Sequence, residues 1–437
     1  MKACTAVSSG SRSNLQAFLL IACGVIAAAQ IGKAIISIPL IRSEMALSLG
    51  GAGLIVATFA TLGASLGIGA GAAVRRLGVR RSLVGGMGVI AAGNLIGAAA
   101  PNEFFLLAAR VIEGFGFLGT VLAIPSMLAQ VAAREQRDFV MAVWSAYMPA
   151  GIMLMLFLGP LVPIIGWRVL WLSCALGAAG TSVLLGLYAP ALADLALERG
   201  FFAEVFRVIR RPVCLVVAFA FFAYTCQIFS LAFALPLLLT STSGLSLGTA
   251  GLLSAAVLAV STVGHVSSGY LLRSGLPIWA VIALALSFFA LSAFGVYANG
   301  LPSYTICAMA ALALGIGGLA PGAIYAAAPH AAPTPEAVPA TIGLVQQASS
   351  LGQFTGPVIL GLWVEHYSWT AAPIIVAPAA LLGVAAAFVL RSVLVQPKIG
   401  VPTLLAPRQA RVPLLNEIAA PSERFFLTRQ LDRRSVG

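Results

Sequence analysis

The sequence predicts an all-α integral membrane protein in which twelve transmembrane helices form two pseudo-symmetric six-helix bundles. Of its 437 residues, 60% are hydrophobic and 9% are charged, whereas about a quarter of the residues of a soluble protein are charged. The mean hydropathy of the chain is +1.02. Because so little of this chain is suited to water, we expect the bilayer to be the solvent for most of its surface.

The twelve expected helices are apolar stretches long enough to cross a hydrocarbon core of about 30 Å. In the first half of the chain they are 15–38, 48–73, 82–100, 103–131, 138–163 and 168–190. In the second half they are 213–238, 246–272, 277–298, 302–328, 338–366 and 369–391. The first stretch is much longer than the apolar region of a signal peptide, so we expect it to be a retained helix.

Two short motifs recur at one interval and indicate a duplicated bundle. The basic turn Arg76-x-Gly78 after the second stretch reappears as Arg273-x-Gly275 after the eighth, 197 residues later (273 − 76). Gly159-Pro160 in the fifth stretch reappears as Gly356-Pro357 in the eleventh, at the same interval. Two independent motifs at one offset favour parallel repeats of six helices each.

Four parts of the chain follow from this layout: an N-terminal six-helix bundle (1–190), a linker (191–212), a C-terminal six-helix bundle (213–395) and a basic tail (396–437). In the linker, Phe202, Phe206 and Ile209 recur at helical spacing among charged residues. This pattern is typical of an amphipathic helix that lies on the membrane surface.

The arginines of the loops predict the orientation of the chain. With the N-terminus inside the cell, the inner loops and the tail hold nearly all of them, and the outer loops hold only Arg42 and Arg168. Because cytoplasmic loops are enriched in Lys and Arg, we expect both termini, the linker and the tail in the cytoplasm of a bacterial inner membrane. The formal charge of +12 is then a topology signal, and no nucleic acid is expected as a partner.

Three local motifs carry a family resemblance. They are the turn from Gly71 to Arg81, the helical segment Arg110-Val-Ile-Glu113-Gly114, and Gly159-Pro160. With the duplicated twelve-helix plan, they resemble the major facilitator superfamily over nearly the whole chain up to about residue 395. The resemblance implies a secondary transporter that works by alternating access, with Arg76 and Gly78 in a gating turn.

The sequence departs from that family in two places. Arg75 stands where the family usually has an acidic residue in the turn, and Leu161, Val162 and Pro163 follow Gly159-Pro160 where the antiporter form of the motif has paired glycines. The second departure weighs against a drug antiporter.

Several other activities are disfavoured by what the sequence lacks. It has no G-x-x-x-x-G-K-[ST] loop for ATP, and the string from Gly114 to Gly119, which matches a dinucleotide fingerprint, lacks the required strand. The six cysteines have no metal-ligand spacing and are expected to be core residues. A membrane-bound enzyme or sensor would need a catalytic constellation or a soluble domain, so we expect no enzyme, no cofactor and no metal.

Charged residues inside the spans are few, and they are the first candidates for a site. Lys33 lies roughly 8 Å below the outer end of its expected helix and Arg110 roughly 9 Å below that of its own. The resemblance implies that both helices border the central cavity, so Lys33 and Arg110 are expected to attract an anion. Glu113, one turn from Arg110, is expected to be its partner and a proton-coupling residue. The alternatives are a Lys33 that extends to the outer headgroups and a structural Arg110.

Polar residues elsewhere complete the candidate site. Tyr224 and Gln227 in the seventh stretch and Gln346 in the eleventh are expected to bind substrate, and Tyr147 to stack on a planar one. His265 in the eighth is a candidate for proton coupling. Each of these residues has an alternative role in packing or in hydrogen bonding to a neighbouring helix.

The expected function is therefore secondary active transport of a small, anionic organic solute, driven by a proton or other ion gradient. The expected partners are the solute, the coupling ion and membrane lipids, and the expected state is a monomer. The alternative is a drug or metabolite efflux antiporter, although the first helix carries no acidic residue to trap a cationic drug.

Overall fold

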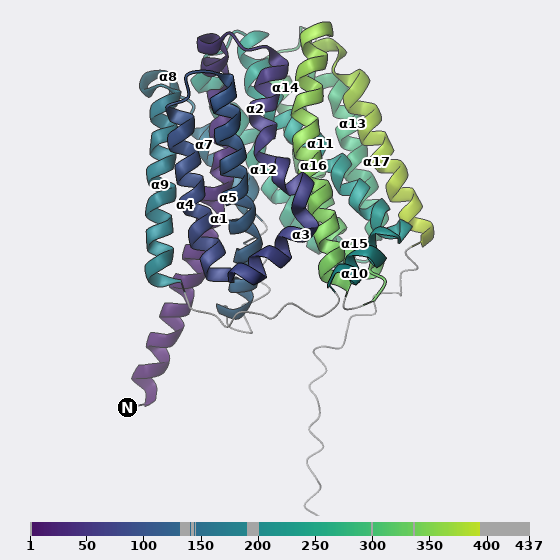
Figure 1. Ribbon diagram of the computed structural model, residues 1–437. Helices are drawn as coiled ribbons and strands as arrows, with labels where there is room; N and C mark the ends of the chain where they lie inside the picture. The colour runs from purple at the N-terminus through teal and green to yellow at the C-terminus, as the bar shows by residue number, and fades with distance from the viewer. Residues whose placement is uncertain are drawn as a thin grey trace, which may run out of the picture. The chain divides into compact units, whose positions relative to one another are not determined.

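The computed structural model describes residues 2–131, 140, 144, 146–189, 201–298, 300–334 and 337–393. Within these ranges the chain is helical and contains no strand. The helices run side by side, and the start of α1 and the end of α17 lie at the same end of the bundle (Figure 1). The two ends of a chain lie at the same end of a bundle when the chain crosses it an even number of times. The tail, residues 190–200 and the expected inner-loop arginines Arg134 and Arg137 lie outside the described residues.

The helices of the first half correspond to six crossings. They are α1 (Lys2–Met45), α2 (Leu49–Ala57), η1 (Thr58–Ala60), α3 (Thr61–Leu77), α4 (Val79–Ala98), α5 (Glu103–Val131), α7 (Tyr147–Phe157), α8 (Val162–Ile165) and α9 (Trp167–Tyr188). Here α2, η1 and α3 form one crossing, which is interrupted by a single 3₁₀ turn.

The second half repeats this order. Its helices are α10 (Phe201–Ile209), α11 (Pro212–Ser241), α12 (Leu247–Arg273), α13 (Ile278–Val296), α14 (Ser303–Gly317), α15 (Leu319–Ala331), α16 (Val338–Tyr367), η3 (Trp369–Ala371) and α17 (Pro373–Val393). In the described ranges, nine segments are long and apolar enough to cross a membrane. With α4, α7 and α16 they make the predicted twelve-helix fold.

Some helix boundaries differ from the predictions. The first helix was expected to end at residue 38, but α1 continues through Pro39 to Met45. A proline removes only one backbone hydrogen bond so close to a helix end, and Ile38 and Ile41 are fully buried, so packing holds the last two turns. The tenth crossing, expected as one helix, is divided at Gly318 into α14 and α15.

The repeated motifs occupy equivalent places in the two halves. Gly78 and Gly275 both follow a helix, with φ values of 88° and 94° that favour glycine. Pro39 in α1 and Pro236 in α11 are also 197 residues apart (236 − 39) and each lies inside its helix. The Gly-Pro copies differ, because α7 ends at Phe157 before Gly159, whereas α16 continues through Gly356 and Pro357.

The two halves contact each other at two crossings that carry the Gly-Pro copies. At the first, α2 lies against α16, and a Cβ atom on Gly53 would come within 2.5 Å of the Pro357 carbonyl oxygen. At the second, α7 lies against α12, and a Cβ on Gly251 would come within 2.8 Å of the Leu156 carbonyl oxygen. Glycine therefore lets the backbones of the two halves approach closely at both places.

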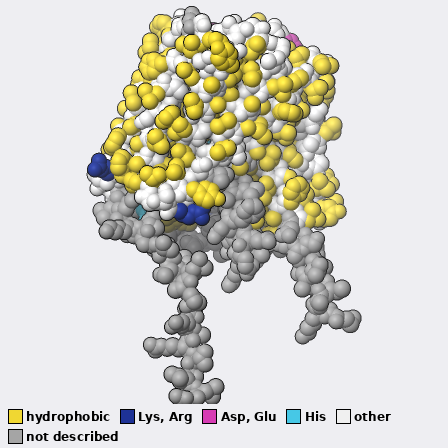
Figure 2. Space-filling view, turned by 180° about the vertical axis from the view of Figure 1, so that it is seen from behind, with side chains coloured by type: hydrophobic (Ala, Val, Ile, Leu, Met, Phe, Trp, Pro, Cys, Tyr) yellow, Lys and Arg dark blue, Asp and Glu magenta, His cyan; other side chains and the backbone are white. Residues whose placement is uncertain are grey.

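The surface suits a lipid environment. Figure 2 shows hydrophobic side chains spread over the whole height of one face, with Lys and Arg visible only near its lower end. The exposed large apolar side chains include Phe18, Phe104, Leu176, Leu291 and Ile374. At the lower end, α10 pairs Glu204 with Arg207 at 3.0 Å and leaves Phe206 exposed.

Candidate functional site

Three charged side chains meet inside the N-terminal half. Lys33 of α1 pairs with Glu113 of α5, with 2.6 Å between Nζ and Oε1. Arg110, one turn before Glu113 on the same helix, pairs with the other carboxylate oxygen through Nη1. All three side chains are 0% exposed. Lys33 and Arg110 thus lie at the same depth in the bundle, where they share one carboxylate.

Two amide side chains extend these ion pairs into a network. The Nζ of Lys33 also donates to Oδ1 of Asn94 in α4, and Nδ2 of Asn94 donates to Oε1 of Gln30 at 2.9 Å. Nη1 of Arg110 donates to the Gln30 carbonyl oxygen at 2.9 Å, and its Nε to that of Ile55 at 3.1 Å. We call Gln30, Lys33, Asn94, Arg110 and Glu113 the charge cluster.

Aromatic rings close the charge cluster on two sides. The Nζ of Lys33 lies 3.9 Å from the ring centroid of Trp171 in α9, and the guanidinium carbon of Arg110 lies 4.6 Å from that of Phe59. Such contacts stabilise a cation that has lost its water. All of these partners belong to the N-terminal half, so the charge cluster is enclosed within that half.

The charges of the cluster do not balance. Two cations share one carboxylate, so the cluster carries one excess positive charge when all three groups are ionised. Nη2 of Arg110 is buried and has no hydrogen-bond partner among the described residues. Buried polar atoms normally have partners, so this nitrogen is open to a further acceptor.

The predicted residues of the C-terminal half are not brought together with the charge cluster. Tyr224 is buried between Phe221 and Phe289, and its hydroxyl has no partner in the described structure. Gln227 donates from Nε2 to the Val376 carbonyl oxygen at 3.1 Å, while its Oε1 is buried without a partner. Both residues therefore offer a free polar atom.

Two further candidates in this half are bound to neighbours. Oε1 of Gln346 accepts a hydrogen bond of 2.6 Å from the Tyr325 hydroxyl. His265 lies 2.7 Å through Nδ1 from the Ser261 carbonyl oxygen of its own helix. A carbonyl can only accept, so Nδ1 carries the proton in this contact and Nε2 is left as the second nitrogen.

The remaining predicted residues lie elsewhere in the N-terminal half. Tyr147 stacks on Trp144, with ring centroids 4.2 Å apart and planes at 6°, so one of its faces is covered. Arg76 is exposed near the end of α3, and Gly78 directly precedes α4, where its carbonyl accepts from the Ser82 amide. Cys23, Cys174, Cys214 and Cys307 are buried and free, in agreement with their expected place in the core.

Sequence reasoning missed the two amides of the charge cluster. Asn94 and Gln30 are uncharged, and the candidates sought in the first six helices were charged or aromatic. Gln347, next to the predicted Gln346, binds across the halves, since its Nε2 donates to the Ala64 carbonyl oxygen at 2.8 Å and its Oε1 accepts from the Ile68 amide at 3.1 Å. A search for every polar side chain in an apolar span of the first half would have found Asn94 and Gln30.

Solved structures share this fold. One is a bacterial homologue of the human lysosomal transporter Spinster, in an inward-facing and unoccupied conformation, with 14% sequence identity, a TM-score of 0.67 and coverage of 88% of this chain and 95% of that one. The occupied inward-facing form of such a homologue has 15% identity, a TM-score of 0.68 and coverage of 86% and 96%. At this identity, the likeness concerns the fold alone.

Sequence comparison gives two further matches. The methylenomycin A resistance protein of Bacillus subtilis (strain 168) is 30% identical over 144 residues, which are 32% of this chain and 30% of that protein. The model of the Major Facilitator Superfamily matches residues 20–334 and 217–428. The two matches begin 197 residues apart (217 − 20), which is the interval of the repeated motifs. The chain therefore belongs to the major facilitator superfamily, and it is a multi-pass membrane transporter of small-molecule solutes.

Proposed function

We propose that this transporter moves a small, anionic organic solute, driven by a proton or other ion gradient. The observation that carries the proposal is the charge imbalance of the cluster, in which Lys33 and Arg110 share Glu113 alone. An excess buried charge is costly in an apolar bundle. An anionic substrate would balance it, with Nη2 of Arg110 as a donor that is already free.

The same arrangement supports coupling to protons. When Glu113 accepts a proton, the cluster holds two cations and no anion, and its attraction for an anionic substrate rises. Because linkage between two binding events is reciprocal, a bound anion also favours the protonated carboxyl. Proton and anion then travel in the same direction, and His265 is a second candidate for the proton.

Access to the cluster requires movement, because its charged side chains are fully enclosed. We place the moving bodies at residues 1–190 and 213–395, joined by the linker 191–212, with the tail 396–437 and both termini in the cytoplasm of a bacterial inner membrane. Rocking of one half against the other would open the cluster toward the C-terminal half. There Tyr224 and Gln227 supply free polar atoms, and Gln346 and Tyr147 complete the proposed contacts.

The test is anion binding by purified variants in one detergent. A thermal-shift screen of organic anions identifies a ligand, since a ligand stabilises the folded state it binds. Lys33→Gln and Arg110→Gln should then each weaken its binding by more than about tenfold, because loss of one partner of a buried charge contact costs about 2–5 kcal/mol. Lys33→Arg should retain more affinity than Lys33→Gln.

Arg168→Gln is the matched control, since Arg168 forms a partly exposed ion pair outside the cluster. Its affinity for the anion should equal that of the parent. Wild-type affinity in both Lys33→Gln and Arg110→Gln would overturn the anion site and leave the transporter fold in place.

Efflux is the second candidate, and the similarity to a resistance protein favours it. An efflux antiporter would exchange the solute for protons. In proteoliposomes with an imposed proton gradient, cotransport moves the anion down the gradient together with the protons, and antiport moves it in the opposite direction. The direction of anion flux therefore separates the two functions.

A further inference from the structure

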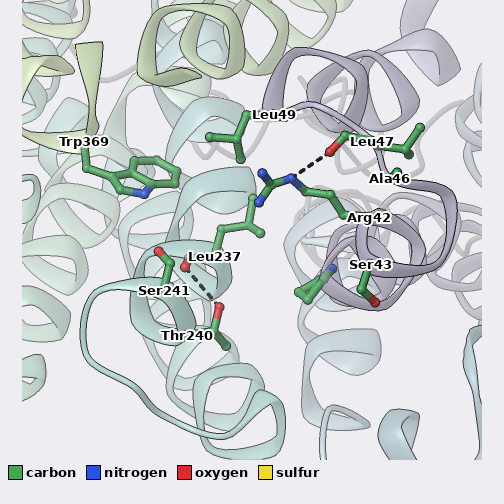
Figure 3. A pocket seen from close by; sticks show the side chains of 10 residues that line it. Arg42, Ser43, Ala46, Leu47, Leu49, Leu237, Thr240, Ser241 and Trp369 are labelled. Atoms are coloured by element: carbon green, nitrogen blue, oxygen red, sulfur yellow. Dashed lines mark hydrogen bonds between the residues drawn. The ribbon is translucent and has the colours of Figure 1, made fainter. Parts of the chain in front are cut away.

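A pocket lies between the two halves where α1 and α11 end (Figure 3). Its volume is about 580 Å³, which is within the range of small-molecule sites. By the predicted topology, this end of the bundle faces outward. The residues that line it include Arg42, Ala46, Leu47, Leu237, Ser241 and Trp369.

Arg42 supplies the charge of this pocket. Its Nε donates to the Leu47 carbonyl oxygen at 3.0 Å, which directs the guanidinium between Leu49 and Leu237, as Figure 3 shows. In the part of the chain that the structure describes, the two Nη groups have no hydrogen-bond or ion-pair partner. The side chain is only half-buried, so these nitrogens are available to a ligand.

Arg168, the other outer-loop arginine, is neutralised by a carboxylate. Nη2 of Arg168 pairs with Oε1 of Glu44 at 2.7 Å, and Oε2 of Glu44 accepts from the Trp167 indole nitrogen at 2.6 Å. The carboxylate nearest to Arg42 in sequence is thus already bound elsewhere. Arg42 remains an unpaired cation in a pocket of apolar walls.

The pocket joins equivalent helix ends of the two repeats. Pro39 and Ser43 of α1 correspond, at the 197-residue interval, to Pro236 and Thr240 of α11. Arg42 corresponds to Leu239, which is fully buried. The hydroxyls of Ser43 and Thr240 are therefore a symmetric pair, while the cation comes from one half alone, so the pocket has a charged side and an apolar side.

The backbone around the pocket is held in an unusual conformation. Ala46 and Ser368 are the two non-glycine residues with positive φ in the described structure, at 52° and 75°. Ala46 lines the pocket, and Ser368 directly precedes Trp369. Such conformations cost energy and tend to occur at functional sites. The Trp369 ring also lies parallel to that of Tyr297, with planes at 2° and centroids 6.2 Å apart.

We propose that this pocket is an outer subsite for a small organic monoanion with a planar or apolar body. The carboxylate binds the Nη groups of Arg42, and the body packs against Trp369, Leu47 and Leu237. The subsite rests on the proposed function for its substrate class: it would collect the anion before the charge cluster receives it, because an unpaired cation raises the local concentration of anions.

The test uses benzoate as the probe and benzyl alcohol as its uncharged counterpart. Ser241→Cys in the full chain places a thiol in the pocket, where its rate of reaction with a membrane-impermeant maleimide can be measured on intact cells. Benzoate should slow this reaction and benzyl alcohol should not. The parent protein, whose described cysteines are mostly buried, provides the background rate.

Two arginine variants decide the outcome. Arg42→Gln should raise the benzoate concentration needed for half protection about tenfold, which corresponds to about 1.4 kcal/mol, and Arg168→Gln should leave it unchanged. Equal protection in Arg42→Gln, or no protection by benzoate in the parent, would overturn the subsite. Maleimide labelling of Ser241→Cys only in inverted vesicles would overturn its outward position.

A separate measurement keeps the subsite and the proposed function apart. Benzoate protection reports on the pocket alone, whereas uptake of the screened anion by Lys33→Gln and Arg110→Gln reports on the charge cluster. Normal uptake in both of these variants, with protection still dependent on Arg42, would reject the proposed cluster site and keep the outer pocket.

Discussion

The two halves of this transporter share a backbone plan but differ in the chemistry of their interiors. The N-terminal half buries Lys33, Arg110 and Glu113. In the described C-terminal half, the buried polar side chains are all uncharged. They are Thr225, Gln227, Ser230, Ser254, Ser261, Ser268, Thr341, Ser349, Ser350 and Gln353.

Helix packing does not explain this difference, because both halves pack their helices in the same manner. In the first half, a Cβ on Gly151 of α7 would lie 2.5 Å from the Val25 carbonyl oxygen of α1. In the second, a Cβ on Gly352 of α16 would lie 2.5 Å from the Phe222 carbonyl oxygen of α11. Close glycine crossings therefore occur in both halves, although Gly151 corresponds to Ala348 at the 197-residue interval, while the buried charges of the described residues belong to one half only. The buried charges that the proposed function uses thus belong to the first half, and the second contributes uncharged hydrogen-bonding groups and His265.

The largest effect on the free energy of unfolding is expected from a substitution in the charge cluster of the N-terminal half. Glu113→Gln leaves Lys33 and Arg110 buried without a carboxylate and should lower the free energy of unfolding by about 3–5 kcal/mol. Lys33→Met should cost less, because it leaves one cation paired with one carboxylate. Denaturant unfolding in a single detergent measures both, and equal losses would show that the charge imbalance is not what matters.

The next effect should be equal in the two halves. Gly151→Leu and Gly352→Leu each force a side chain against the backbone of a neighbouring helix, and each should cost about 1–3 kcal/mol. The same unfolding assay compares them. A cost that is clearly larger in one half would mean that packing, as well as charge, distinguishes the halves.

A smaller effect separates buried from exposed charge within the first half. Glu44→Gln removes an ion pair whose side chains are 38% and 47% exposed, so it should cost only about 0.2–1 kcal/mol. This cost should shrink as salt is added, because salt screens exposed charges. The cost of Glu113→Gln should stay constant over the same salt series, and a parallel decline would argue that water reaches the charge cluster.

The smallest effect is expected in the neutral half. The Tyr224 hydroxyl has no partner to lose, so Tyr224→Phe should change the free energy of unfolding by less than about 0.5 kcal/mol. If the hydroxyl binds substrate as proposed, transport should nevertheless fall. Unchanged stability with unchanged transport would remove Tyr224 from the site.

The sequence was sufficient for those features that depend on composition along the chain. Apolar length located the helices, and the interval between Gly78 and Gly275 revealed the duplication. The end of α1 was placed seven residues too early, because tertiary packing carries the helix through Pro39 to Met45. Local patterns contain no information about such packing.

The charge cluster was only partly predictable, for a similar reason. The scarcity of charge in the spans pointed to Lys33, Arg110 and Glu113, since a buried charge in a membrane needs a reason. The directions of their side chains depend on the rotation of each helix, which hydropathy does not fix. The structure was therefore needed to show that Lys33 contacts Asn94 and Trp171. It was also needed to show that Gln347, and not Gln346, binds at the contact between the halves.

The buried ion pairs also constrain how the protein is made. Lys33 emerges from the ribosome 61 residues before Asn94 and 80 residues before Glu113. At about 5–20 residues per second, the lysine waits roughly 4–16 s for its carboxylate. A lone cation at the centre of a hydrocarbon layer is unfavourable by about 2.5–3.5 kcal/mol or more. Retention of the first helix at the insertion machinery or at the interface until the fourth crossing arrives would remove this cost, because the lysine would then enter the lipid together with its carboxylate.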